Sequence, residues 1–354
     1  MAPLLALVLG ACATQAPPTD PLATPSPPAA SSADPAPAPV PDRPPRLTAS
    51  AAQLDFLRDW SARENRLYQV AAPLLIANTA LCKRHARMLA GFTVRTRYSY
   101  SHEYSAAAQQ ALGLDERLQV TNVMAGSGAQ RSGLQPGDIL YSLQGKPLPV
   151  GAQAERDAAI LVGQAMDGRD SINVTVLRGE HQVALDVPLT RACALGIELG
   201  DADFVNSYAD NQRVMVTRGM LDHVRSDEEL AYVLAKEMAH AILAQGPRPA
   251  FSARINSLLR FSTAAPTPGR STIKPYSPVA DSTADKLAMY MLVGAGHPID
   301  NVAAFWRNLA TRYPAAEPDS HTALHPSTAY RLSVMNAVRN AIRAKQKNGM
   351  PLQP

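Results

Sequence analysis

The spacing of apolar residues changes twice along the chain. Over residues 48–82 they recur mostly every three or four positions, which predicts a helix. Over residues 91–189 they alternate with polar residues, which predicts β-strands. Helical spacing returns after residue 226. The positions that carry the alternation include Leu118, Val120, Ile139, Leu143, Ile172, Val174, Val176, Val183, Leu185, Val187 and Leu189. We therefore expect an α+β protein with an N-terminal helix, a small β-rich domain and a mostly helical C-terminal domain.

Turn residues separate the predicted strands. Gly126-Ser127-Gly128 leads into a short helical turn, Gly133 suits the left-handed conformation that ends it, and Pro136-Gly137 suits a type II turn. One further helix is expected around residues 152–162. These motifs, followed by Gln144-Gly145-Lys146, have the order and spacing of bacterial PDZ domains, so residues 91–190 resemble that family.

The PDZ resemblance implies a binding site for peptide C-termini. Such domains take up a partner's C-terminus as an added strand between a sheet edge and a helix. By analogy the peptide-binding residues are Gly91, Phe92 and Val94, opposite the predicted helix. The alternative is a PDZ fold that serves only as a spacer.

The N-terminus predicts export and lipidation. Residues 3–10 form a short apolar run, and Leu9-Gly10-Ala11-Cys12 resembles the bacterial lipobox, in which the cysteine is lipidated after cleavage. Residues 1–12 are therefore interpreted as a lipoprotein signal segment; the alternative is an ordinary signal peptide in which Cys12 is incidental. Ala13 is not Asp, which by family analogy implies an outer-membrane lipoprotein facing the periplasm.

Residues 13–47 are dominated by Pro, Ala, Ser and Thr. This composition buries too little apolar surface to fold, so the segment is interpreted as a disordered tether. Its C-terminal neighbour, residues 48–90, is interpreted as a helical lead-in to the PDZ-like domain.

The cysteines agree with an envelope protein, and the net charge bears on nucleic-acid binding. Apart from Cys12 the chain contains Cys82 and Cys193, which flank the β-rich region, and we predict a disulfide between them. The alternative is two buried free thiols. A net charge of +4 from scattered residues forms no basic stripe, so nucleic acid is excluded as a partner.

The helix after residue 226 carries the most informative motif. Ser226 and Glu229 have the spacing of a capping box. The helix continues as Lys236-Glu237-Met238-Ala239-His240, the zinc-protease pattern H-E-x-x-H with its first His replaced by Lys. Glu237 lies on the apolar face, so its carboxylate must meet a cation, a metal or a proton.

Residues 195–347 resemble the HtpX and CAAX-protease family of zinc metallopeptidases (peptidase family 48). The resemblance rests on this helix, on Asp281 to Asp285 at the place of the family's E-x-x-x-D, and on His325-Pro326 with Arg331. It implies that His240 and the residue at position 281 are metal ligands. It also implies that Glu237, as general base, together with Asp285 and His325, belongs to the catalytic site.

Two departures from the family pattern affect the metal. An ammonium at Lys236 has no lone pair to offer zinc, and Asp281 is one methylene shorter than Glu. We expect Lys236 to pair with Asp281 at the vacated metal position; the alternative is a side chain that reaches solvent. A second expectation is that an altered metal site remains, in which His240, Asp281 and His325 bind the ion. The cofactor is therefore zinc if the protein is active, and otherwise none.

Three functions remain open to the sequence. The first is a pseudopeptidase, inactive or weakly active, that binds exported or misfolded proteins and peptide C-termini in envelope quality control. The second is an active zinc metalloendopeptidase that degrades exported proteins. The third is a purely scaffolding protein. In each, the membrane is contacted through the lipid anchor.

Overall fold

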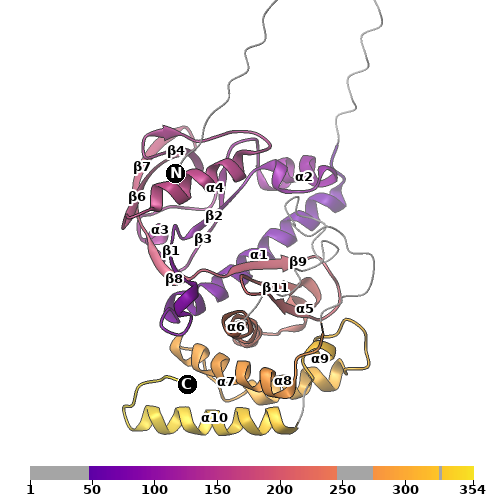
Figure 1. Cartoon of the computed structure of the whole chain (residues 1–354). Helices are drawn as coiled ribbons and strands as arrows, with labels where there is room; N and C mark the ends of the chain where they lie inside the picture. The colour runs from indigo at the N-terminus through magenta and orange to yellow at the C-terminus, as the bar shows by residue number, and fades with distance from the viewer. Residues whose placement is uncertain (1–47, 245–273, 327–328) are drawn as a thin grey trace, which may run out of the picture. The chain divides into compact units, whose positions relative to one another are not determined.

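The computed structural model describes residues 48–244, 274–326 and 329–354. The predicted signal segment with Cys12 and the predicted tether lie outside the described residues. The described part has the predicted α+β organisation of an N-terminal helix, a β-rich region and a mostly helical C-terminal region (Figure 1). Among the described helices, none combines the length and apolar character that a membrane span needs.

Helix α1 (Ala51–Ala77) is the predicted N-terminal helix. The Ser50 side chain accepts a hydrogen bond from the Gln53 backbone N–H, and the Gln53 side chain accepts one from the Ser50 backbone N–H. This capping box satisfies two donors that a helix start leaves unpaired. The helix continues through Pro73 without dividing, and it ends at Ala77 rather than at residue 82.

Helix α1 contacts both the β-rich and the C-terminal regions. It packs against α2 (His102–Leu112) and against α6 (Asp227–Leu243). Its buried Glu64 pairs with Arg95 of strand β2 (Phe92–Arg95) at 2.5 Å. A buried carboxylate needs such a partner, so this ion pair satisfies a charge on the apolar face of α1.

The β-rich region is built on one antiparallel sheet. Its strands, in order across the sheet, are β2 (Phe92–Arg95), β3 (Gln119–Val123), β4 (Ile139–Leu143), β6 (Ser171–Arg178) and β7 (His181–Pro188), with β5 (Lys146–Pro147) paired to β4. Ile172, Val174 and Val176 are buried in its core, as the alternation predicts. Helix α4 (Ala154–Met166) lies where one was expected.

The first predicted turn has a steric reason for its second glycine. Ser127 caps the short helix α3 (Gly128–Arg131), and a Cβ at Gly128 would lie 1.8 Å from the carbonyl oxygen of Pro188. No side chain fits there, so the glycine allows α3 to approach the end of β7.

A second, two-stranded sheet joins the ends of the β-rich region. Strand β1 (Ala86–Leu89) pairs antiparallel with β8 (Thr190–Cys193). Residues 86–89 were predicted to belong to a helical lead-in, and that prediction is wrong. The predicted disulfide between Cys82 and Cys193 is present beside this ladder.

The C-terminal region combines a small sheet with helices. In the sheet, β11 (Arg213–Thr217) lies between β10 (Ser207–Ala209), which is antiparallel to it, and β9 (Gly196–Gly200), which is parallel to it. The helices are α5 (Arg218–His223), α6, α7 (Pro278–Gly294), α8 (Val302–Arg312), α9 (His321–Leu324) and α10 (Ala329–Lys347). Helix α7 packs against both α6 and α10 (Figure 1).

Helix α6 starts at the predicted cap. The Ser226 side chain accepts a hydrogen bond from the Glu229 backbone N–H. The Glu229 carboxylate, however, accepts from the backbone N–H of Arg225 rather than from that of Ser226. Half of the predicted capping box therefore forms, and the other half is shifted by one residue.

Candidate metal centre

Helix α6 carries three polar side chains into the protein interior. Lys236 and Glu237 are 0% exposed and His240 is 6% exposed. Lys236 and His240 are four residues apart, so they lie on one face of the helix, one turn apart. Helix α7 presents Asp281 and Asp285 to this face, and both are buried as well.

The Lys236 ammonium is held between the two aspartates. Its Nζ lies 2.7 Å from Asp281 Oδ1 and 2.7 Å from Asp285 Oδ1. It also lies 5.4 Å from the ring centroid of Trp306, within range of a cation–π contact. The predicted pair with Asp281 is confirmed, and Asp285 is a second partner that was not predicted. The alternative, a side chain that reaches solvent, is wrong.

Arg331 of α10 closes the cluster from the other side. Its Nε and Nη2 donate to the two oxygens of Asp285 at 2.8 and 3.0 Å, which is a bidentate arrangement. Its Nη1 lies 3.0 Å from Asp281 Oδ2 and donates to the backbone oxygens of His325 and Pro326 at 3.1 and 3.0 Å. Arg331 thus fixes the His325-Pro326 segment against α7.

Asp281 is the centre of the hydrogen-bond network. Besides Lys236, its Oδ1 has His240 Nε2 and His325 Nδ1 at 2.9 Å each. A carboxylate only accepts, so both imidazole nitrogens carry the hydrogen. Burial by itself would raise the pKa of Asp281, but the Lys236 ammonium and the two imidazole donors hold it well below its usual value.

The histidines around Asp281 are neutral at pH 7. Burial lowers the pKa of His240 to about 4, and the Lys236 ammonium adds to this while Asp281 opposes it. Burial likewise lowers the pKa of His325 and of His321 well below the usual value. The charged groups of the cluster are therefore Lys236 and Arg331 against three carboxylates, Glu237 and the two aspartates of α7. The described cluster thus has an excess of one negative charge.

Glu237 faces a different neighbour, the short helix α9. Its Oε1 accepts a hydrogen bond from Ser207 Oγ at 3.0 Å and lies 3.4 Å from His325 Nε2. His321, one turn before His325, stacks on the His325 ring at 4.3 Å between centroids. His321 was not among the predicted site residues. The spacing H-x-x-x-H at residues 321–325 was the available signal.

The described residues contain two groups with metal-ligand chemistry. One is His240, Asp281 and His325, and the other is Glu237, His321 and His325. The first group surrounds Asp281 Oδ1, which already accepts from the Lys236 ammonium at 2.7 Å. A divalent cation bound there would meet that ammonium, so the residues do not fit zinc at the position that H-E-x-x-H helices give it.

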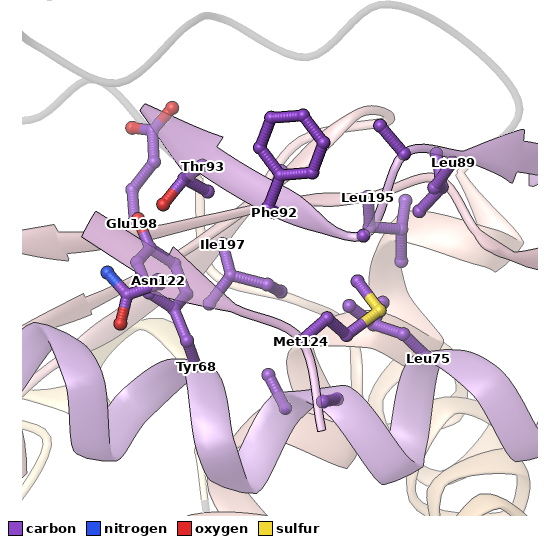
Figure 2. A pocket seen from close by; sticks show the side chains of 15 residues that line it. Tyr68, Leu75, Leu89, Phe92, Thr93, Asn122, Met124, Leu195, Ile197 and Glu198 are labelled. Carbon is purple, nitrogen blue, oxygen red and sulfur yellow. The ribbon is translucent and has the colours of Figure 1, made fainter. Parts of the chain in front are cut away.

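The predicted peptide-binding residues lie at the edge of the β-rich sheet. Strand β2 is the outermost strand on its side of the sheet. Gly91 and Phe92 line a cavity of about 400 Å³ that is bounded by α1, the connection between β1 and β2, and β9 (Figure 2). Val94 does not line it; like Phe92, it packs beside the core of the β-rich region. Whether these residues bind peptide stays a prediction.

The cavity is mainly apolar. The residues that line it include Leu75 and Tyr68 from α1, Met124 after β3, and Ile197 and Glu198 from β9 (Figure 2). Strand β9 is, like β2, an outer strand of its sheet. The cavity therefore lies between the edges of two separate sheets, with α1 as its floor.

Comparison with known proteins identifies the C-terminal region. Residues 197–339 match the model of Peptidase family M48. No protein with a curated description matches the chain. Among solved structures, the chain is similar to the HtrA3 PDZ domain bound to a phage-derived ligand (FGRWV), with 22% sequence identity, a TM-score of 0.23, and coverage of 30% of this chain and 88% of that chain. Family M48 is zinc-dependent. The chain therefore carries a peptidase family M48 domain at residues 197–339.

Proposed function

We propose that this chain is a cell-envelope lipoprotein that binds exported or misfolded proteins and whose M48 domain is not a functional zinc peptidase. The observation that carries the proposal is the buried Lys236 ammonium, which lies 2.7 Å from each of two aspartates of α7. Position 236 is where the H-E-x-x-H pattern has its first zinc ligand.

Charge explains why Lys236 suits a site without zinc. Two carboxylates left facing each other in a buried site repel each other, and a nearby cation removes that cost. Zinc supplies this charge in a metallopeptidase, and the ammonium supplies it here. Arg331 adds a second fixed cation, so Asp281 and Asp285 are neutralised without a metal.

Protein binding is supported by the β-rich region. Its outermost strand β2, the adjoining apolar cavity and the sequence motifs all suit capture of a peptide C-terminus as an added strand. The disulfide between Cys82 and Cys193 supports an oxidising compartment such as the periplasm, because disulfides persist there. Lipidation at Cys12 would attach the protein to the membrane.

An active zinc metalloendopeptidase is the second candidate. It is favoured by the retention of Glu237 and His240, both buried on α6. In that function Glu237 would act as the general base on a zinc-bound water, as the family resemblance implies.

Cleavage of an unfolded protein separates the two candidates. Wild type and Glu237→Gln are compared on fluorescently labelled casein, with added zinc and with a chelator. We expect both to cleave at the same background rate. Faster cleavage by the wild type that is lost in Glu237→Gln and with the chelator would contradict the proposal.

Peptide binding separates a binding protein from a scaffold. A library of peptides with free C-termini is compared with the same sequences carrying amidated C-termini. We expect binding only with the free carboxylate, and weaker binding by Phe92→Ala. Equal binding of both forms, or none, would contradict a PDZ-like role and favour a scaffold.

A further inference from the structure

Helix α9 carries a pair of histidines with the spacing of metal ligands. His321 is the first residue of α9 and His325 is its C-cap, and their rings stack with centroids 4.3 Å apart. They are 1% and 2% exposed. Pairs of histidines at this spacing on a helix bind zinc in the H-E-x-x-H pattern, which has lost its own pair at Lys236.

The hydrogen bond of His325 to Asp281 uses Nδ1 and leaves Nε2, on the side of Glu237, to bind a metal. Its Nδ1 donates to Asp281 Oδ1 at 2.9 Å, and its Nε2 lies 3.4 Å from Glu237 Oε1. Metal-binding histidines typically donate one ring N–H to a carboxylate, which fixes the ring and presents the other nitrogen to the ion. Asp281 is the carboxylate that orients His325 in this way.

His321 presents an unpartnered nitrogen. Its Nδ1 lies 3.4 Å from Ser207 Oγ, while its buried Nε2 has no hydrogen-bond partner among the described residues. A buried polar atom without a partner is costly and calls for an explanation, and a bound ion is one. The ring is held in place because it stacks between Trp306 and His325, with centroids 4.9 and 4.3 Å away.

From these contacts we propose that the chain binds one zinc ion, or a similar divalent transition metal, through Glu237, His321 and His325. One ligand atom from each of the three lies within 4.8 Å of the others. Tetrahedral zinc ligands lie about 3.4 Å apart, so small side-chain movements bring them together. This set uses neither His240 nor position 236, so it is distinct from the metal position of the H-E-x-x-H helix.

The displaced site goes beyond the proposed function and does not conflict with it. A carboxylate that coordinates the metal is no longer available to accept a proton from a metal-bound water, and Glu237 is that carboxylate. The protein would then bind zinc without the general base that peptide hydrolysis needs. Zinc would fix α9 against α6.

Zinc titration of the full chain tests the site. Metal-free protein is titrated with zinc against a chromophoric chelator, and with cobalt(II) for its ligand-field spectrum. We expect one zinc per chain, an affinity at least tenfold lower in His321→Gln, and an unchanged affinity in His240→Gln. Exposed His181→Gln is the control for adventitious binding. The isosteric variant Glu237→Gln should also bind zinc with at least tenfold lower affinity. This second variant keeps the test decisive if His321→Gln does not fold.

Two outcomes would overturn the site. One is wild-type protein that binds no zinc. The other is affinity that depends on His240 and not on His321 or Glu237, which would place the ion at the family's position. Cleavage of casein is measured separately, so zinc bound at the displaced site without cleavage leaves the proposed function intact.

Discussion

Replacing Lys236 by Met removes the ammonium while keeping an unbranched side chain of similar length. The variant loses two contacts of 2.7 Å, to Asp281 and Asp285, and leaves Arg331 as the one remaining cation of the described cluster. The excess of negative charge among these buried groups rises from one to two. Because both aspartates are at most 2% exposed, solvent screens little of this change.

The expected loss of stability is large for a single substitution. Removing one partner of a buried ion pair costs about 3 to 5 kcal/mol, because the other charge is left uncompensated. With an m-value near 3 kcal/mol per M of urea, the midpoint falls by about 1 to 2 M.

Tryptophan fluorescence can follow this unfolding. Of the chain's two tryptophans, Trp306 lies against Lys236. In a Trp60→Phe background the signal therefore reports on the cluster. Lys286→Met on the same helix as Asp281 is the matched control, because Lys286 is exposed and its loss should change stability by less than about 0.5 kcal/mol.

A double-mutant cycle tests the cause. Asp285→Asn in the Lys236→Met background returns the charge excess to one, so the two substitutions should couple by about 1 to 3 kcal/mol. If Lys236→Met were as stable as Lys286→Met, the ammonium would not be balancing the aspartates, and the reasoning would be refuted.

Three further predictions concern pH, the disulfide and the lipid anchor. The unfolding free energy should fall as pH drops from about 6.5 to 5. The folded pKa of His240, about 4, lies below its unfolded pKa, so in this pH range only the unfolded chain takes up the proton. His240 should contribute a slope of up to about 1.4 kcal/mol per pH unit. His240→Gln should reduce that slope in urea titrations at each pH, and an unchanged slope would contradict the assignment. Replacing Cys82 and Cys193 by Ser opens a link across 111 residues and should lower stability by at most about 4 to 5 kcal/mol, with no further loss on adding reductant. Metabolic labelling with palmitate should mark the wild type but not Cys12→Ser; an unlabelled wild type would contradict lipidation.

Local signals predicted several elements well. The start of α6 at Ser226 follows from a cap and a run of acids, and the strands β6 and β7 follow from strict alternation. Helix α2 was not predicted, although its run of alanines is a strong helix former and was a usable signal. Strand β1 has only four residues and pairs with β8 more than 100 residues later, so no local pattern could show it.

The candidate site shows the same limit. The Lys236 and Asp281 pair could be predicted because a family pattern places both residues around one metal. Asp285 as a second partner depends on how far α7 is rotated against α6, which the sequence does not show. His321 approaches Glu237 only because α9 folds back toward β10, where the backbone N–H of His321 donates to the backbone oxygen of Val205, two residues before that strand.

The most direct test of the role of Lys236 is to restore the missing ligand. In a His321→Gln background, which removes the displaced site, the zinc affinity of Lys236→His is compared with that of the background alone. If position 236 is a vacated ligand position, the substitution should raise zinc affinity at least tenfold, because the introduced imidazole can bind the ion together with His240 and a carboxylate of α7. An affinity equal to that of His321→Gln alone would contradict the claim that Lys236 stands where the family places its zinc ligand.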